Sequence, residues 1–236
     1  MKFPNPLLRG TLVRRYKRFM ADVVLDTGET VTAHCANSGS MLSVNEEDAE
    51  VWLSPAQNPD RKLKYTWEMI RIGTTLVGIN TSLPNKLVEE AIVAGKIKEL
   101  KGYANLRREV KYGKNSRIDI LLEDDTKPPC YVEVKNVTMK RDLDPKAPAE
   151  FPDAVTARGT KHLGELVDMV KAGNRAVMFY LVQREDSKSF TVADDIDPAY
   201  AKALARAIKA GVEVLCYACT LSPEDIRISR PLKTRF

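Results

Sequence analysis

The pattern of apolar residues changes once along the chain, near residue 83, and this change constrains the fold more than any other feature. Before it, short apolar runs with strand character are separated by loops rich in Pro and Asn. After it, helical segments alternate with strand segments, which is typical of an α/β domain with a mixed sheet. We therefore predict two domains in the chain of 236 residues, residues 1–82 and residues 83–236.

The first domain is predicted to be a small closed β-barrel. Asp26-Thr-Gly-Glu29 is typical of a hairpin turn between two strands. About five or six short strands suit a barrel of the OB type, and many such barrels bind nucleic acid on one face. An empty barrel that serves only as an interaction module is the alternative. The strands are expected at residues 12–16, 21–25, 30–35, 51–53, 65–72 and 75–79.

The second domain is predicted to alternate helices with the strands of a mixed sheet. Pro84 near the first turn and Gly95 at the end mark its first helix. Thr160 is a plausible N-cap for the second helix. The continuous apolar run at 175–183 suggests a strand buried on both faces. We expect helices at 84–95, 160–172 and 198–210, and strands at 106–112, 117–122, 131–137, 175–183 and 212–218.

Two neighbouring strand segments carry charge where a buried strand should have none. Asp119 interrupts the segment 117–122, and Glu133 and Lys135 interrupt the segment 131–137. Because strand residues alternate between two faces, a hairpin of these segments has one aliphatic face and can bring all three charged side chains together on the other. The aliphatic face is expected to hold Ile118, Ile120, Leu122, Val132 and Val134.

These charged residues have two interpretations. One is a solvent-facing hairpin with a cross-strand ion pair, which contributes little to stability. The other is a metal site, because two carboxylates ~5 Å apart repel by roughly 3 kcal/mol at an effective dielectric of ~20, and a divalent cation offsets more of this than one lysine can. Mg²⁺ or Mn²⁺ would take oxygen ligands from Asp119 and Glu133. Glu90 is the candidate third ligand, with Glu89 as its rival and an exposed helix carboxylate as the alternative.

The order of elements around these residues resembles that of the PD-(D/E)xK nuclease superfamily. The first acidic residue of that motif matches Asp119, and its E-x-K matches Glu133-Val134-Lys135. The chain departs from the motif at Ile118, which stands where the motif has proline. The resemblance implies hydrolysis of phosphodiester bonds, with Asp119 and Glu133 holding the metal and Lys135 orienting water or stabilising charge on the phosphate.

A second resemblance covers nearly the whole chain and rests on seven ordered blocks. These are residues 15–22, 34–41, 85–91, 109–113, 116–119, 131–135 and 151–162. In these blocks the sequence is similar to the sugar fermentation stimulation protein A family. This resemblance implies an N-terminal OB-like barrel, a C-terminal restriction-endonuclease-like α/β domain and DNA binding. The family name points to the expression of sugar-utilisation genes and does not establish an enzymatic reaction.

Basic residues suggest where nucleic acid would bind. In the barrel, four cations flank an aromatic residue, a combination that suits backbone contact and base stacking; a solvated strand edge is the alternative. Arg158 and Lys161 lie at a predicted helix start, where phosphate binds well, with simple capping as the alternative. The window 96–117 holds eight Lys and Arg side chains against two Glu. The predicted contacts are Arg14, Arg15, Tyr16, Lys17, Arg18, Asn37, Lys111, Arg158 and Lys161.

Composition narrows the remaining classes. The net charge is +5, which is mildly basic. No apolar run is long enough to span a membrane and no signal peptide is apparent, so we expect a cytoplasmic protein with reduced cysteines. Cys216 and Cys219 have C-x-x-C spacing within a strand, which places them on opposite faces and argues against a zinc or redox site. No Walker loop, dinucleotide fingerprint or nucleophile elbow is present.

Two functions therefore follow from the sequence. The first is a DNA-binding, Mg²⁺- or Mn²⁺-dependent nuclease that uses Asp119, Glu133 and Lys135. The second is a non-catalytic DNA-binding regulator of sugar-utilisation genes on a nuclease-like scaffold. RNA in place of DNA and a homodimer both remain open.

Overall fold

The N-terminal part of the chain closes into a five-stranded barrel in the computed structural model, which describes residues 1–58, 60–113 and 116–236. The barrel closes because β3 pairs with β2 on one side and, in parallel, with β5 on the other. Alternate residues point inward, so Val23 and Leu12 are buried while their strand neighbours are more exposed. The predicted OB-like barrel is confirmed. Its strands are β1 (Leu8–Tyr16), β2 (Met20–Leu25), β3 (Thr30–Cys35), β4 (Glu50–Pro55) and β5 (Tyr65–Ile72), with β6 (Thr75–Gly78) beside β5.

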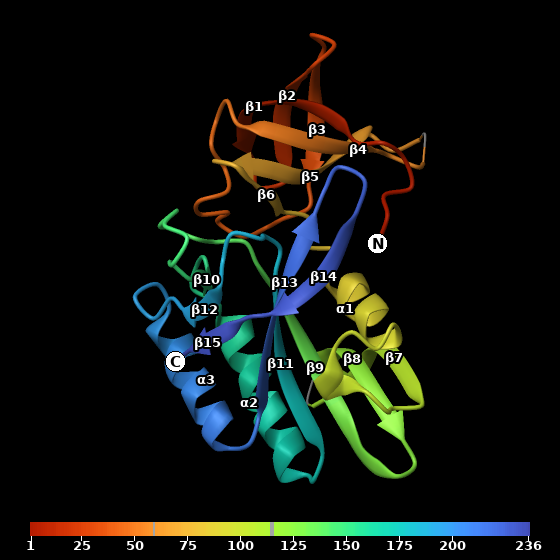
Figure 1. Cartoon of the computed structure of the whole chain (residues 1–236), viewed down its shortest axis with the longest axis vertical. Helices are drawn as coiled ribbons and strands as arrows, with labels where there is room; N and C mark the ends of the chain where they lie inside the picture. Colours follow the sequence, from red (N-terminus) through yellow and green to blue (C-terminus); the bar gives the residue numbers. More distant parts are fainter. Residues whose placement is uncertain (59, 114–115) are drawn as a thin grey trace.

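The rest of the chain forms a mixed sheet with helices on both faces (Figure 1). Its strand order is β14-β13-β11-β9-β8-β7, in which β9, β11 and β13 are parallel and the outer strands are antiparallel. Helix α1 packs on one face, and α2 and α3 pack on the other. The elements are α1 (Pro84–Val93), β7 (Asn105–Tyr112), β8 (Ser116–Asp124), β9 (Lys127–Val137), α2 (Ala157–Lys171), β11 (Arg175–Val182), α3 (Pro198–Lys209), β13 (Glu213–Leu221) and β14 (Ile226–Pro231).

Several short elements were not predicted from the sequence. A three-residue 3₁₀ turn (Lys98–Leu100) follows α1, and a small separate sheet pairs three strands of three or four residues in parallel. Strands this short show no clear alternation, and the last of them is exposed along its whole length. The small sheet consists of β10 (Ala149–Phe151), β12 (Ser189–Val192) and β15 (Lys233–Arg235).

Helix α2 begins earlier than the sequence suggested. Its N-cap is Thr156, whose hydroxyl accepts a hydrogen bond from the Gly159 backbone N–H at 3.0 Å. Thr160, the predicted N-cap, lies inside the helix, and its N–H donates to the Thr156 carbonyl at 3.1 Å. Asp197 caps α3 and also accepts from the Thr156 N–H at 2.8 Å, so one carboxylate ties the starts of two helices together. Either threonine has the chemistry of a cap; the contact with Asp197 selects Thr156.

The alternation of β8 breaks at Asp119, against the prediction that Ile118, Ile120 and Leu122 share one face. Ile120 and Leu122 pack with α1, but Ile118 packs on the opposite face with α2. The break lies opposite Glu109 of β7, whose φ of 54° interrupts regular strand geometry. The turn of the backbone at this point alters the direction in which Asp119 leaves the sheet.

The remaining core agrees with the sequence. Cys216 and Cys219 pack on opposite faces of the sheet, and all four cysteines are buried and free. Both tryptophans are buried: Trp67 lies in the barrel, and Trp52 packs against the C-terminal domain. Within the described part of the chain, no helix combines the length and apolar character that crossing a membrane requires.

Candidate functional site

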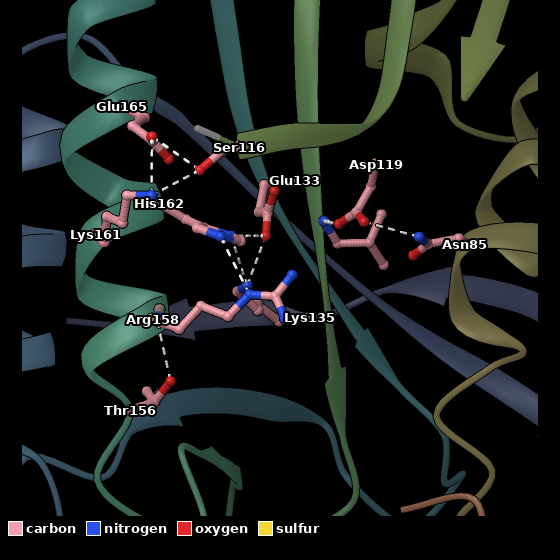
Figure 2. Close-up of polar contacts among 12 residues, drawn as sticks. Asn85, Ser116, Asp119, Glu133, Lys135, Thr156, Arg158, Lys161, His162 and Glu165 are labelled. Atoms are coloured by element: carbon pink, nitrogen blue, oxygen red, sulfur yellow. Dashed lines mark hydrogen bonds and ion pairs between the residues drawn. The ribbon is translucent and has the colours of Figure 1, made fainter. Parts of the chain in front are cut away.

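The three charged residues of the interrupted strands lie where β8 and β9 pass between α1 and α2 (Figure 2). The Lys135 ammonium donates to Glu133 Oε1 at 2.7 Å, and the Glu133 side chain is 3% exposed. Asp119 reaches in the other direction, toward Asn85 of α1, while Glu133 reaches toward α2 (Figure 2). The prediction that alternation places all three on one face is therefore wrong for Asp119, because of the break in β8.

Asp119 is nevertheless electrostatically coupled to Glu133. Burial and the charge of Glu133 together raise the pKa of Asp119 to about 6. Two hydrogen bonds oppose this shift: the Val134 N–H donates to Oδ2 at 2.7 Å, and the Asn85 amide donates to Oδ1 at 2.8 Å. The pair therefore has the like-charge repulsion that a bound cation relieves.

Glu133 has a partner that the sequence did not single out, His162 of α2. His162 is 5% exposed, and its Nδ1 contacts Glu133 Oε1. Arg158, one helical turn earlier, donates from Nε to His162 Nε2 at 3.4 Å. An acceptor at Nε2 leaves the ring proton on Nδ1, from where it donates to Glu133. Burial raises the pKa of Glu133, but the hydrogen bond from His162 and the charge of Lys135 outweigh it and hold the pKa below its ordinary value.

The i,i+4 spacing of Arg158 and His162 is the sequence signal for this contact. It identifies a shared helix face. It does not reveal that the face meets β9, which depends on how α2 packs on the sheet.

The carboxylates of Asp119 and Glu133 supply oxygen atoms that a bound cation requires as ligands. Glu133 Oε2 is buried and has no hydrogen-bond partner within the described residues, an unusual state for a charged oxygen. Asp119 and Glu133 together offer the hard oxygen donors that Mg²⁺, Mn²⁺ and Ca²⁺ take. No cluster of three or more His, Cys, Asp or Glu side chains suited to a metal occurs in residues 1–58, 60–113 and 116–236. A cation here would therefore complete its shell with water or backbone oxygens.

Glu90, the predicted third ligand, is engaged elsewhere. Its Oε2 lies 3.0 Å from the amino group of Met1, on the outer side of α1 that faces β14. Its rival Glu89 pairs with Arg108 at 3.2 Å. The structure thus pairs Lys135 with Glu133, couples Asp119 to Glu133 through charge alone, and leaves out both helix carboxylates.

A cavity of about 340 Å³ opens beside these residues, between the barrel and the C-terminal domain. Its walls include Asn37 of the barrel, Asn85 of α1, and Lys135 and Arg158. Asn85 hydrogen-bonds Asp119, Lys135 hydrogen-bonds Glu133, and Arg158 hydrogen-bonds His162. The cavity is therefore lined by residues that hydrogen-bond Asp119, Glu133 and His162, whereas these three side chains are not themselves part of its lining.

The basic stretch of the barrel is divided by the structure. Arg14 pairs with Asp22 at 3.0 Å and lies over the Tyr16 ring, 4.9 Å from its centroid. Arg15 turns inward and donates to the carbonyls of the loop that follows β3. Lys17 and Arg18 lie exposed in the turn between β1 and β2.

The two remaining predicted contacts lie away from the cavity walls. Lys161 donates to Ser116 Oγ at 3.1 Å and lies 3.6 Å from Glu165 Oε1. Lys111 is exposed on β7, at the edge of the sheet. Residues 114 and 115 of the same basic window lie outside the described residues. Among the predicted nucleic-acid contacts, the structure therefore brings Asn37 and Arg158 to the cavity, together with Lys135.

Known proteins resemble this chain along its full length. Residues 13–79 match the SfsA N-terminal OB domain, and residues 82–225 match the sugar fermentation stimulation protein RE domain. The sugar fermentation stimulation protein homolog of Rhodospirillum rubrum is 62% identical over 98% of both chains. That of Paramagnetospirillum magneticum is 60% identical over 98% of this chain and 97% of its own.

Among solved structures, Pyrococcus furiosus SfsA in complex with Ca²⁺ superposes with a TM-score of 0.89. It is 25% identical, and the match covers 100% of this chain and 98% of that one. Both the sequence matches and the two-domain architecture lead to the same assignment: this chain belongs to the sugar fermentation stimulation protein A (SfsA) family.

Proposed function

We propose that this protein is a DNA-binding, metal-dependent nuclease that hydrolyses phosphodiester bonds at Asp119, Glu133 and Lys135. One observation carries the proposal: Glu133 keeps a buried, unpartnered carboxylate oxygen beside Lys135 and the coupled Asp119, next to a cavity that reaches solvent. A buried carboxylate oxygen without a hydrogen bond costs stability, and a bound cation would offset this cost. The Ca²⁺ complex of the P. furiosus relative supports a divalent cation at this fold.

Asp119 and Glu133 would hold Mg²⁺ or Mn²⁺. When bound, the cation supplies Lewis-acid stabilisation of charge on a scissile phosphate. Lys135 supplies a positive charge of the chain itself, held by Glu133 at the cavity wall. His162 fixes the orientation of Glu133, so it acts through that carboxylate as a positioning residue. Arg158 presents its guanidinium at the same cavity and would bind a neighbouring phosphate.

Incubation of the purified protein with single- and double-stranded DNA and RNA tests this function. Cleavage is expected with Mg²⁺ or Mn²⁺ and is expected to stop with EDTA. If every substrate stays intact while DNA still binds, the enzymatic proposal fails.

That outcome would favour the second candidate, a non-catalytic DNA-binding regulator of sugar-utilisation genes. One observation favours this second function: both carboxylate oxygens of Asp119 already accept hydrogen bonds from the protein, from Val134 and Asn85. In either case we place the protein in the cytoplasm, since four free, buried thiols suit a reducing compartment.

Stabilisation by a divalent cation is expected to grow as the pH rises through about 6. The pKa of Asp119 is about 6, above its ordinary 3.8, so below that pH a proton competes with the cation. Without metal the sign is opposite: the folded state binds this proton more tightly than the unfolded state, so the contribution of Asp119 to stability falls as pH rises from about 4 to about 6. The shift in thermal unfolding midpoint with Mg²⁺ or Mn²⁺, measured at about pH 5 and about pH 8, checks this.

Asp119→Asn should lose most of this shift, and Glu123→Gln should keep it. Glu123 lies on the same strand but pairs with Arg107 at the surface. An equal shift at both pH values, or one that survives in Asp119→Asn, would remove Asp119 from the cation site.

DNA affinity is expected to fall with salt and to depend on the turn of the barrel. Lys17 and Arg18 are exposed in that turn, without the inward contacts that occupy Arg15. Replacing either with Ala should weaken binding similarly for all sequences and lower the slope of log affinity against log salt by about 1. Fluorescence anisotropy over a salt series measures both, with Lys209→Ala on α3 as control. An unchanged slope would mean that this turn does not contact phosphate.

A further inference from the structure

The cavity at the candidate site has a wall that both domains hold in place. The wall consists of Asn37, Ser38 and Gly39, which belong to the loop of residues 36–43, the first part of the segment between β3 and β4. From the barrel, Arg15 Nη2 donates to the carbonyls of Asn37 and Gly39 at 2.9 and 3.0 Å. From the C-terminal domain, Asp153 Oδ2 accepts from the Met41 N–H at 2.8 Å, and its carbonyl accepts from Ser40 Oγ at 2.6 Å.

Close packing holds the same wall. A Cβ placed on Gly39 would lie 3.0 Å from Asp153 Oδ2, so a larger residue there would require the carboxylate or the loop to shift. Further along, Ser43 Oγ accepts from the Lys140 N–H at 3.1 Å. These hydrogen bonds and close contacts hold the loop in place at the edge of the cavity. The loop therefore limits the width of a ligand that can reach Lys135.

The chemistry of the cavity suits one nucleotide. Its volume of about 340 Å³ lies in the range that takes a small molecule. Arg158 uses Nε for His162, and its two terminal nitrogens have no hydrogen-bond partner within the described residues. These two guanidinium nitrogens at the cavity, together with the nearby Lys135 ammonium, can bind the oxygens of a phosphate group.

The rest of the lining includes two carboxylates, of Glu150 and Asp153, which are engaged with Arg141 and with the Met41 N–H, and uncharged polar groups that suit a base. Asn136 accepts from Gln183 through Oδ1 at 2.8 Å, which leaves its NH₂ group to donate. Thr138 and Phe151 also line the cavity, and the Phe151 ring packs against the rings of Tyr180 and Tyr200. Amide donors and an aromatic ring are the groups that read and stack unpaired bases.

We infer that the cavity takes one nucleotide of a single-stranded nucleic acid, with its phosphate on Arg158 and Lys135, and that the loop of residues 36–43 excludes an intact duplex. The inference rests on the proposed function, because it names the substrate of that site. In a duplex each base is paired inside the double helix, which is too wide for the cavity. A nucleotide of a duplex therefore cannot place both its phosphate and its base in the cavity. A single strand can bend its backbone and present both.

Binding rather than cleavage tests the inference. The probes are fluorescent single-stranded DNA, single-stranded RNA, the blunt DNA duplex of the same sequence, and that duplex with a single-stranded overhang, all with Ca²⁺. Single strands and the overhang are expected to bind at least about tenfold more tightly than the blunt duplex. The DNA and RNA arms show which sugar is preferred. Equal affinity for the blunt duplex would overturn the inference.

Two variants connect the preference to the cavity. Arg158→Ala should weaken single-strand binding by roughly 10- to 100-fold, the loss of charge-assisted phosphate hydrogen bonds, while Arg206→Ala on the exposed face of α3 leaves it unchanged. Ser40→Ala with Asp153→Ala releases the wall and should narrow the gap between duplex and single strand. A gap unchanged in this double variant would show that the wall does not select the substrate.

These outcomes separate the inference from the nuclease proposal. A protein that prefers single strands but cleaves nothing keeps the inference and loses the enzyme. A protein that cleaves blunt duplex as fast as single strands keeps the enzyme and loses the inference.

Discussion

Glu133→Gln is expected to abolish metal-dependent cleavage, and Lys135→Ala to reduce it about as severely. Glutamine keeps the shape of the side chain but removes the charge that would hold the cation and that pairs with Lys135 at 2.7 Å. Loss of one preorganised charged group from a hydrolytic site costs on the order of 10²–10³ in rate. Because Glu133 would hold the cation itself, we expect its loss to lie at or beyond the upper end of that range.

The measurement is the initial rate of cleavage under saturating Mg²⁺ or Mn²⁺. Glu123→Gln on β8 and Lys209→Ala on α3 change the same residue types away from the candidate site and should keep the wild-type rate. Thermal unfolding shows whether each variant is folded. A folded Glu133→Gln protein that cleaves at the wild-type rate would place the chemistry elsewhere.

His162→Ala should reduce the rate less than either change, because its ring acts through Glu133. The split between kcat and KM distinguishes this role from a structural one. Loss of orientation should lower kcat at an unchanged KM.

The second large effect concerns stability: Arg184→Met is expected to destabilise the protein by about 3–5 kcal/mol. Arg184 is fully buried and donates to both oxygens of Asp186, at 2.7 and 2.9 Å, and to the Thr138 carbonyl at 2.8 Å. Lys140, with a buried side chain, donates to the Asp186 carbonyl at 2.8 Å. Removing the guanidinium leaves the buried Thr138 carbonyl without this donor and leaves Asp186, whose side chain is 22% exposed, with Lys140 as its remaining cation, which costs more than the pair contributes.

Arg184 also lies at the junction of the domains. It forms a β-bridge with Val77 of the barrel, and the neighbouring Gln183 carbonyl accepts from the Gly78 N–H at 2.9 Å. The midpoint of thermal unfolding should fall by about 10 °C, since 1 kcal/mol corresponds to ~2–4 °C for a chain of this size. Arg206→Met, on the exposed face of α3, is the matched control. A fall of no more than ~2 °C would contradict the prediction.

The local patterns of the sequence were reliable wherever the element was long and one-sided. The barrel strands, the three long helices and the buried strand β11 were all predicted within a few residues of their observed bounds. Two kinds of element were missed. One is β14 (Ile226–Pro231), a six-residue strand of the main sheet that follows the last predicted strand; the others are short elements such as Ala149–Phe151, whose three residues offer no period to recognise. The cap of α2 was misplaced because Thr156 and Thr160 are equally suited to the role locally.

The residues of the candidate site also fall into those that the sequence identified and those that it did not. The charges of Asp119, Glu133 and Lys135 stand out in the sequence because they interrupt apolar strands. His162 does not stand out, because its contact with Glu133 joins residues 29 positions apart. Glu90 was predicted as a ligand from its helix, but the amino group of Met1 pairs with it instead.

The sequence alone determined the two-domain order, the OB-like barrel, the mixed sheet and the residue types of the site, since these depend on periodicity and composition within short segments. Three features arise only in the tertiary structure: the break of β8 at Asp119, the contact of His162 with Glu133 and the cavity between the domains. The physical reason is the difference in sequence separation between the interacting residues. Alternation and capping act over a few neighbouring residues, whereas these three features arise where segments far apart in the chain compete for the same contacts.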